Sequence, residues 1–210
     1  MVKSIRGVWV FGKGRLAIET AKLANSLPQY VLKGVVPVRN EPDWDLSFRS
    51  WGIEFGCDVM DIDDWRQATT HSRDIGLSIY FDELFKPSDI ARLDTFLNLH
   101  NSPLPKYRGM RPINWALENQ ESSHGVTLHK IERGIDTGAI LGQIIFPIFH
   151  KNQEVRDVYE SCIAHAKVLI EDVLKFSDFN DFKPQDDSSA SYYSSSDIGL
   201  LLKRSGWERI

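Results

Sequence analysis

Short apolar runs alternate with segments of helical periodicity over the first hundred residues. Apolar runs of strand length occupy five stretches, at 5–11, 31–38, 58–62, 75–81 and 96–100. Between the first two, residues 15–27 place apolar side chains at the spacing of an amphipathic helix. Shorter helices are expected to begin near Asp63 and Pro87. Strands that alternate with helices predict an α/β fold, a Rossmann-like, doubly wound and mostly parallel sheet with a short C-terminal extension.

The pattern changes after residue 101. A loop rich in proline and glycine precedes five expected elements: a helix at 113–118, a strand at 126–131, a turn at 134–138, a strand at 139–148 and the longest helix at 153–176. From about residue 179 the chain is rich in aspartate and serine, with a short apolar turn at 198–202. We therefore expect one main domain over 1–178 and a C-terminal tail or lid over 179–210. Its small apolar content predicts little contribution to folding.

Composition and charge narrow the classes of function. The chain has 210 residues, of which 42% are hydrophobic, enough for a domain with a full core. Its net charge is −4 with acids and bases mixed, so nucleic acid is not an expected partner. Cys57 and Cys162 lack metal-site or redox spacing, so no metal is expected and a reducing cytoplasm is favoured. With no signal peptide and no apolar run near ~20 residues, no membrane partner is expected.

A glycine turn follows the first expected strand. Gly12-Lys13-Gly14 opens a helix, whose backbone N–H groups could hold an anion. Position 17, the third glycine of a dinucleotide fingerprint, is Ala17, which is an allowed variant. However, no acidic residue ends the second strand, which closes on Val38-Arg39. A tight turn is therefore the favoured interpretation, and a nicotinamide dehydrogenase is disfavoured.

Asn98 and His100 stand out at the end of the fifth expected strand. Residues two apart on a strand point to the same side, and parallel α/β sheets bind ligands at the carboxyl ends of their strands. An amide and an imidazole placed there can both aim at one carbonyl oxygen. By themselves these two residues fit either an ordinary polar strand end or a catalytic pair. Asp136, between two glycines, likewise fits an ordinary turn.

The neighbouring motifs resemble one known family. Residues 98–109 read NLHNSPLPKYRG and residues 125–142 read GVTLHKIERGIDTGAILG, with Trp115-Ala116 between them. This order of an Asn-x-His pair, a Ser-x-Leu-Pro-x-Tyr-Arg-Gly loop, a Trp-Ala pair, a Gly-Val-Thr strand and a Gly-x-Asp-x-Gly turn is similar to the formyltetrahydrofolate-dependent formyltransferases. The similarity is strong over 96–145 and weak but colinear over 5–95. It implies an enzyme that moves a formyl group from N10-formyltetrahydrofolate, its co-substrate, to an amine.

The resemblance implies catalytic roles for Asn98, His100 and Asp136. Attack of the amine on the formyl carbon forms a tetrahedral oxyanion, to which Asn98 can donate a hydrogen bond. His100 can accept the amine proton or donate to the oxyanion. Asp136 can support the imidazole or pass a proton through a water. The sequence leaves this proton path open. His129, on a strand, is interpreted as structural, and His124 as a surface residue.

Folate is expected, from the resemblance, beside the loop after the strand at 75–81 and beside the glycine turn. A fused pterin needs backbone donors and acceptors together with an apolar slot. Core packing is the alternative for Phe81 and Leu84. The expected folate-binding residues are Tyr80, Phe81, Asp82, Glu83, Leu84, Ile135, Thr137 and Gly138.

The amine acceptor separates the branches of the family. The methionyl-tRNA branch carries a further tRNA-binding domain, for which this chain is short and not basic. The purine branch, which acts on glycinamide ribonucleotide, usually has a Gly-Ser-rich phosphate loop where this chain has Gly12-Lys13-Gly14-Arg15. The string at 100–117 and the tail most resemble the branch that formylates nucleotide-linked amino deoxysugars for surface polysaccharide, such as lipopolysaccharide O-antigen. Glycinamide ribonucleotide formyl transfer and a non-catalytic folate- or nucleotide-binding relative remain alternatives.

A nucleotide sugar offers phosphates to cations and a base to aromatic rings. In an extended tail the two neighbouring tyrosines point to opposite sides, so one can reach a nucleotide while the other packs inward. The sequence leaves open the sugar, the base, the ring position of the amine and whether the protein is a homodimer. The expected acceptor-binding residues are Lys13, Ser102, Lys106, Arg108, Arg111, Trp115, Tyr192 and Tyr193.

Overall fold

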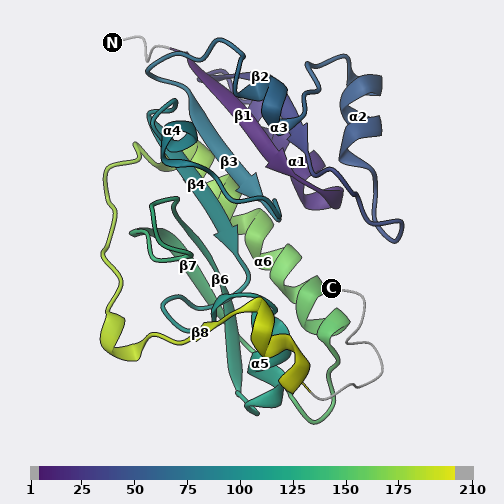
Figure 1. The fold of residues 1–210 in the computed structure, drawn as a ribbon, viewed down its shortest axis with the longest axis vertical. Coiled ribbons are helices and arrows are strands. Elements are labelled where there is room, and N and C mark those ends of the chain that lie inside the picture. The colour runs from purple at the N-terminus through teal and green to yellow at the C-terminus, as the bar shows by residue number, and fades with distance from the viewer. Residues whose placement is uncertain (1–4, 202–210) are drawn as a thin grey trace. The chain divides into compact units, whose positions relative to one another are not determined.

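The structure of the chain, a computed structural model, describes residues 5–201 (Figure 1). It contains two compact units, residues 5–99 with 174–177 and residues 100–173 with 178–201. The elements of the first unit are β1 (Arg6–Gly12), α1 (Gly14–Ser26), β2 (Tyr30–Pro37), α2 (Phe48–Phe55), α3 (Ile62–Trp65), β3 (Ile75–Ile79), α4 (Pro87–Ile90) and β4 (Thr95–His100), whose last residue begins the second unit.

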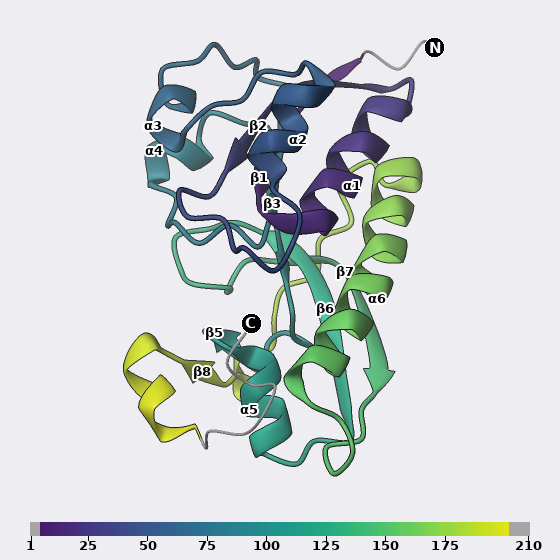
Figure 2. The ribbon, with the colours of Figure 1, turned by 90° about the vertical axis from the view of Figure 1, so that its right-hand side faces the viewer.

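The first unit is a parallel, doubly wound sheet. Its strands lie in the order β2-β1-β3-β4, and every neighbouring pair is parallel. Figure 2 shows α1 on one side of these strands and α3 and α4 on the other. Alternate residues of β1 face opposite sides, and the ring of Phe11 lies 4.9 Å from that of Trp65 in α3. This arrangement confirms the Rossmann-like α/β fold predicted from the alternation of strands and helices.

One expected strand is shorter than its apolar run suggested. Over residues 58–62 only Val59 pairs with the sheet, through a single bridge to Val35. Ile62 is already the first residue of α3, and Asp61 precedes the helix. The side chain of Ile62 is buried. A short apolar run does not distinguish a strand from the start of a helix, and here its last residue belongs to the helix.

The second unit contains an antiparallel pair of strands and the longest helix. β6 pairs with β7 from Ser123 to His129, and β5 pairs in parallel with β8. Among the described residues neither α6, at 22 residues, nor another helix is long and apolar enough to span a bilayer. The elements are β5 (Arg108–Gly109), α5 (Pro112–Glu118), β6 (Ser123–Lys130), β7 (Ile140–Pro147), α6 (Val155–Phe176), whose residues from 174 belong to the first unit, η1 (Asp187–Ser189), β8 (Tyr192–Tyr193) and η2 (Ser195–Leu200).

The tail is held inside the second unit, although its composition predicted little contribution to folding. β8 pairs with β5, at Arg108 and Gly109. A Cβ at Gly109 would lie 2.2 Å from the carbonyl oxygen of Tyr193, so only glycine permits this approach. Backbone pairing and polar side chains hold the tail. The apolar content of a segment does not report such interactions. The compact units divide at residue 99, and residues 202–210 of the expected tail lie outside the described residues.

Candidate active site

His100 ends β4 and is fixed by the loop that follows it. Its side chain is buried, and its Nε2 lies 2.7 Å from the carbonyl oxygen of Tyr107. Because a carbonyl oxygen only accepts hydrogen bonds, Nε2 must carry the proton. Tyr107 itself has a φ of 62°, in the left-handed region that side chains rarely adopt. The loop therefore sets both the orientation and the tautomer of His100.

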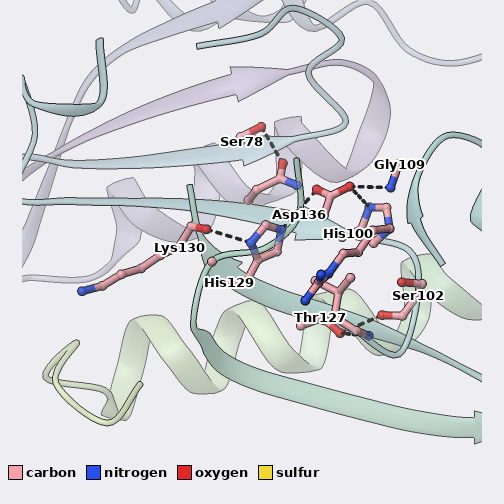
Figure 3. Close-up of polar contacts among 12 residues, drawn as sticks. Ser78, His100, Ser102, Gly109, Thr127, His129, Lys130 and Asp136 are labelled. Carbon is pink, nitrogen blue, oxygen red and sulfur yellow. Dashed lines mark hydrogen bonds and ion pairs between the residues drawn. The ribbon is translucent and has the colours of Figure 1, made fainter. Parts of the chain in front are cut away.

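Asp136 faces His100 from the glycine turn between β6 and β7 (Figure 3). Its φ of 53° is left-handed, a conformation that aspartate tolerates better than most residues. Its Oδ2 accepts a hydrogen bond of 2.9 Å from the backbone N–H of Gly109 and lies 3.6 Å from Nδ1 of His100. The distance to His100 suits an ion pair and is longer than a hydrogen bond.

His129, interpreted from the sequence as structural, lies on the other side of the same carboxylate. Its Nδ1 donates to the carbonyl oxygen of Lys130 at 2.8 Å, and its Nε2 lies 3.4 Å from Oδ1 of Asp136. Thr127 and His129 stand two residues apart on the buried strand β6, the spacing that singled out Asn98 and His100. Polar residues at alternate positions of a buried strand were therefore the available signal.

The neighbours of Asp136 stabilise its ionised carboxylate. Burial alone would raise the pKa of its carboxyl, but the protonated forms of His100 and His129 and the hydrogen bonds from His129 and Gly109 outweigh burial and lower it below its ordinary value. One nitrogen of each imidazole already donates to a carbonyl, so an added proton must go to the nitrogen that faces the carboxylate. The cluster can therefore accept one proton and hold it as a buried ion pair.

Asn98 lies in the first unit, two residues before His100 on β4. Its Oδ1 accepts a hydrogen bond of 2.8 Å from the hydroxyl of Ser78 on β3, and the two residues are register partners. In this contact the amide oxygen is turned toward β3. The NH₂ group is the donor end, as the stabilisation of an oxyanion requires.

The expected folate residues divide between the two units. In the first unit Phe81 packs on Phe85 at 5.2 Å and on Phe11 at 5.8 Å, whereas Leu84 is 77% exposed. Asp82 and Glu83 pair with cations, Asp82 with Lys13 at 3.5 Å and Glu83 with Arg39 at 3.0 Å. Tyr80 adopts a left-handed φ of 60°. In the second unit Ile135 is exposed beside the glycine turn, and Thr137 and Gly138 complete that turn.

Three of the expected acceptor residues are engaged within the second unit. Arg108 is buried and bound to Gln185 and Asp187. Ser102 is buried with its hydroxyl donated to the carbonyl oxygen of Lys106. Trp115 is buried, and its ring stacks on Tyr193 at 4.1 Å. We therefore do not carry these three side chains into the acceptor site proposed below.

The other expected acceptor residues have more exposed side chains. Lys106 is half-exposed and 3.8 Å from Glu121, and Arg111 precedes α5. Tyr192 is 52% exposed while its neighbour Tyr193 packs inward on Trp115, as the alternation of an extended segment predicted. His124, expected at the surface, is fully buried and donates to the carbonyl oxygen of Asn101, because β6 runs through the interior of its unit.

Curated relatives match just under half of the chain. The Bifunctional polymyxin resistance protein ArnA of Wigglesworthia glossinidia brevipalpis is 40% identical over 98 residues, which is 46% of this chain and 15% of that protein. The Methionyl-tRNA formyltransferase of Synechococcus sp. (strain JA-3-3Ab) is 39% identical over 97 residues, 46% of this chain and 30% of that protein. The chain thus spans less than a third of the length of either relative.

Solved structures match nearly the whole chain. WlaRD, described as a sugar 3N-formyl transferase with dTDP and 5-N-formyl-THF, has a TM-score of 0.82 and 26% identity over 95% of this chain and 73% of its own. An N-formyltransferase from Helicobacter canadensis, described with folinic acid and dTDP-3-aminofucose, has a TM-score of 0.81 and 29% identity over 97% and 74% of the two chains. Glycinamide ribonucleotide transformylase 1 from Symbiobacterium toebii, at 18% identity and a TM-score of 0.66 over 87% of this chain and 95% of its own, shares the fold.

The formyl transferase family matches residues 82–174, a range that includes Asn98, His100, His129 and Asp136. The resemblance drawn from the motifs is thereby confirmed, since residues 82–174 match this family.

Proposed function

We propose that the protein transfers the formyl group of N10-formyltetrahydrofolate to the amine of a nucleotide-linked amino deoxysugar. The observation that carries this proposal is the pairing of His100 with the buried Asp136 carboxylate inside the matched region. Asn98 stands two residues before His100 on the same strand, so one strand supplies both an amide donor and an imidazole. This is the set of groups that transfer of an acyl group to an amine needs.

In this reaction the amine nitrogen attacks the formyl carbon, and the carbonyl oxygen becomes an oxyanion that accepts a hydrogen bond from Asn98. His100 takes the amine proton on Nδ1, the nitrogen that faces Asp136, because Nε2 is committed to Tyr107. The Asp136 carboxylate stabilises the imidazolium. Collapse of the intermediate breaks the bond between the formyl carbon and N10, and the proton passes from His100 to N10. The products are the formamide and tetrahydrofolate.

Two observations favour a folate co-substrate. The two sugar formyltransferases with the highest TM-scores above are described with 5-N-formyl-THF and with folinic acid. In each unit of this chain an apolar side chain expected to contact folate is exposed, Leu84 in the first and Ile135 in the second. Exposed apolar side chains gain from being covered by a ring system.

A carboxylate at the first helix favours a nucleotide sugar over glycinamide ribonucleotide. The N-terminus of α1 follows the Gly12-Lys13-Gly14 turn, where an anion would be stabilised by backbone N–H groups. Here Asp45 fills that place, since its Oδ1 accepts a hydrogen bond of 3.2 Å from the N–H of Arg15. A Cβ at Gly14 would lie 2.3 Å from Oδ2 of Asp45. A ribonucleotide phosphate at this turn would meet a negative charge.

Other features fit a reaction in the cytoplasm that supplies sugars for surface polysaccharide such as lipopolysaccharide O-antigen. Cys57 and Cys162 are both free thiols, as a reducing compartment allows. The net charge of −4 disfavours tRNA as the acceptor, although one relative acts on methionyl-tRNA by its name. Similarity over nearly the whole chain to two sugar formyltransferases gives the sugar acceptor its main support.

Kinetics with several acceptors test this proposal. The purified chain is assayed with N10-formyltetrahydrofolate and either glycinamide ribonucleotide or a panel of dTDP- and UDP-linked amino sugars. We expect at least one sugar to exceed glycinamide ribonucleotide in kcat/KM by about tenfold or more, the equivalent of one lost charged contact. A higher kcat/KM for glycinamide ribonucleotide than for every sugar would move the protein to the purine branch, and no turnover with any amine would indicate a non-catalytic relative.

Among the aromatic residues expected to bind the acceptor, Tyr192 is more exposed than Trp115 and Tyr193, so its ring is the one proposed to stack on the base. Its replacement by alanine should raise KM for the nucleotide sugar about tenfold while kcat changes little, because stacking on a base is worth roughly 1–3 kcal/mol and is equal in the ground and transition states. Tyr192→Phe, which keeps the ring, is the matched control and should leave KM near that of the wild type. An unchanged KM in Tyr192→Ala would remove the tail from the acceptor site.

A further inference from the structure

Gln185 joins the tail to the backbone around Asp136. Its Oε1 accepts hydrogen bonds from Nε and Nη2 of Arg108, at 3.0 and 2.7 Å. Its Nε2 donates to the carbonyl oxygens of Asp136 and Gly138, both at 2.8 Å. An arginine only donates and a carbonyl only accepts, so the orientation of the amide is determined by its partners. All the hydrogen-bonding positions of this side chain are used.

These contacts close a ring around the catalytic carboxylate. Arg108 precedes Gly109, whose N–H donates to Oδ2 of Asp136. The same arginine reaches Gln185, which binds the carbonyl of Asp136 from the other side. The loop of Arg108 thus contacts Asp136 twice, directly at its side chain and through Gln185 at its backbone. A shift of the turn would change the distance between Asp136 and His100.

The turn needs this support because its conformation is unfavourable. Asp136 has a φ of 53°, in the left-handed region. A Cβ at Gly138 would lie 2.0 Å from the carbonyl oxygen of Lys130, so the turn also approaches its neighbouring strand closely. Gln185 is contributed by a segment far along the chain, and its amide binds carbonyls on both sides of Thr137. The buried guanidinium of Arg108 fixes that amide in turn.

We propose that Gln185 is a positioning residue for formyl transfer, holding Asp136 at the distance from His100 that the proton transfer requires. This inference rests on the function proposed above for His100 and Asp136. It assigns the tail a role in catalysis that differs from closing over the acceptor. It also explains why Arg108 is buried and bound to Gln185. An arginine that binds a phosphate ligand would have to be accessible.

The test compares two substitutions in the full chain. Gln185→Glu keeps the size and the contact to Arg108 but places a carboxylate oxygen against two carbonyls, and Gln185→Met removes every hydrogen bond. We expect both to lower kcat at least tenfold while KM for N10-formyltetrahydrofolate and for the sugar changes less than threefold. Asp187→Asn is the matched control, since Asp187 is the exposed partner of the same Nη2, and it should keep kcat within twofold.

A second measurement needs no substrate. Histidine side chains labelled with ¹⁵N are compared by NMR at one fixed pH in the wild type and both variants, and we expect the ring signals of His100 and His129 to shift while those of exposed His71 stay. If the wild type transfers formyl to no acceptor, the proposed function fails and these spectra still decide the role of Gln185. Variants that keep kcat within twofold, or whose His100 and His129 signals are unchanged, would overturn the proposal. Misfolding of both variants would show that Gln185 serves the fold, which would overturn it as well.

Discussion

Replacing Asn98 or His100 by alanine should lower kcat by at least ~10², the scale of a lost oxyanion donor or general base. The reason for Asn98 is the loss of an amide whose oxygen is fixed on Ser78 and whose NH₂ group is the donor end. The reason for His100 is the loss of the base that Tyr107 and Asp136 hold in one tautomer. Steady-state kinetics with N10-formyltetrahydrofolate and the preferred sugar measure both effects.

Matched controls are available on the surface of the protein. His71 and Asn152 are exposed, so His71→Ala and Asn152→Ala should keep kcat near the wild-type value. Thermal unfolding separates a loss of chemistry from a loss of fold. More than a tenth of wild-type kcat in both Asn98→Ala and His100→Ala would remove these residues from the catalytic role.

Most elements of the fold were readable from the sequence because apolar periodicity reports burial directly. The runs at 5–11, 31–38 and 75–81 became β1, β2 and β3, each buried on a sheet covered on both sides. The periodic segment at 153–176 became α6. The run at 58–62 was less informative, since a buried helix start and a buried strand have the same apolar content.

The candidate site was only partly readable. Asn98 and His100 were visible because two polar residues interrupt an apolar strand at its end, and Asp136 because a resemblance singled out its turn. His129 was missed, although Thr127 and His129 make the same pattern on β6. The role of His129 depends on its partner, Asp136. That contact forms only because the left-handed turn at Asp136 brings the carboxylate back beside β6, which no local pattern reports.

The tail was the least predictable part. Aspartate and serine indicate a segment that cannot bury much apolar area, and in that respect the composition was informative. The segment is ordered by other means, through β8, through the stacking of Tyr193 on Trp115 and through the amide of Gln185. Each of these interactions depends on a partner more than 45 residues away in the sequence, so no local pattern could show it.

Asp136→Asn should preserve the fold and lower kcat by at least ~10², because the amide has no charge with which to stabilise an imidazolium. The amide oxygen will face the N–H of Gly109, which requires an acceptor. The NH₂ group is then placed where Oδ1 now faces His129, and it can donate to Nε2 of a neutral ring. The variant therefore favours two neutral imidazoles, where the wild-type carboxylate stabilises a proton on either one.

The pH dependence of stability gives this substitution a second readout. The pKa of Asp136 is lower in the folded chain than its ordinary value of 3.8, because the charges of its two histidine partners and the hydrogen bonds from His129 and Gly109 outweigh burial. The resulting stabilisation is fully present above that ordinary value and is lost as the pH falls through the lower folded-state pKa. Urea unfolding should therefore show the wild type more stable than Asp136→Asn at about pH 7, with a difference that shrinks below about pH 4. Asp43→Asn, at an exposed carboxyl, is the matched control and should change neither kcat nor this difference. Equal stability at all pH values together with unchanged kcat would show that Asp136 is a turn residue, and the ion pair with His100 would then carry no catalytic role.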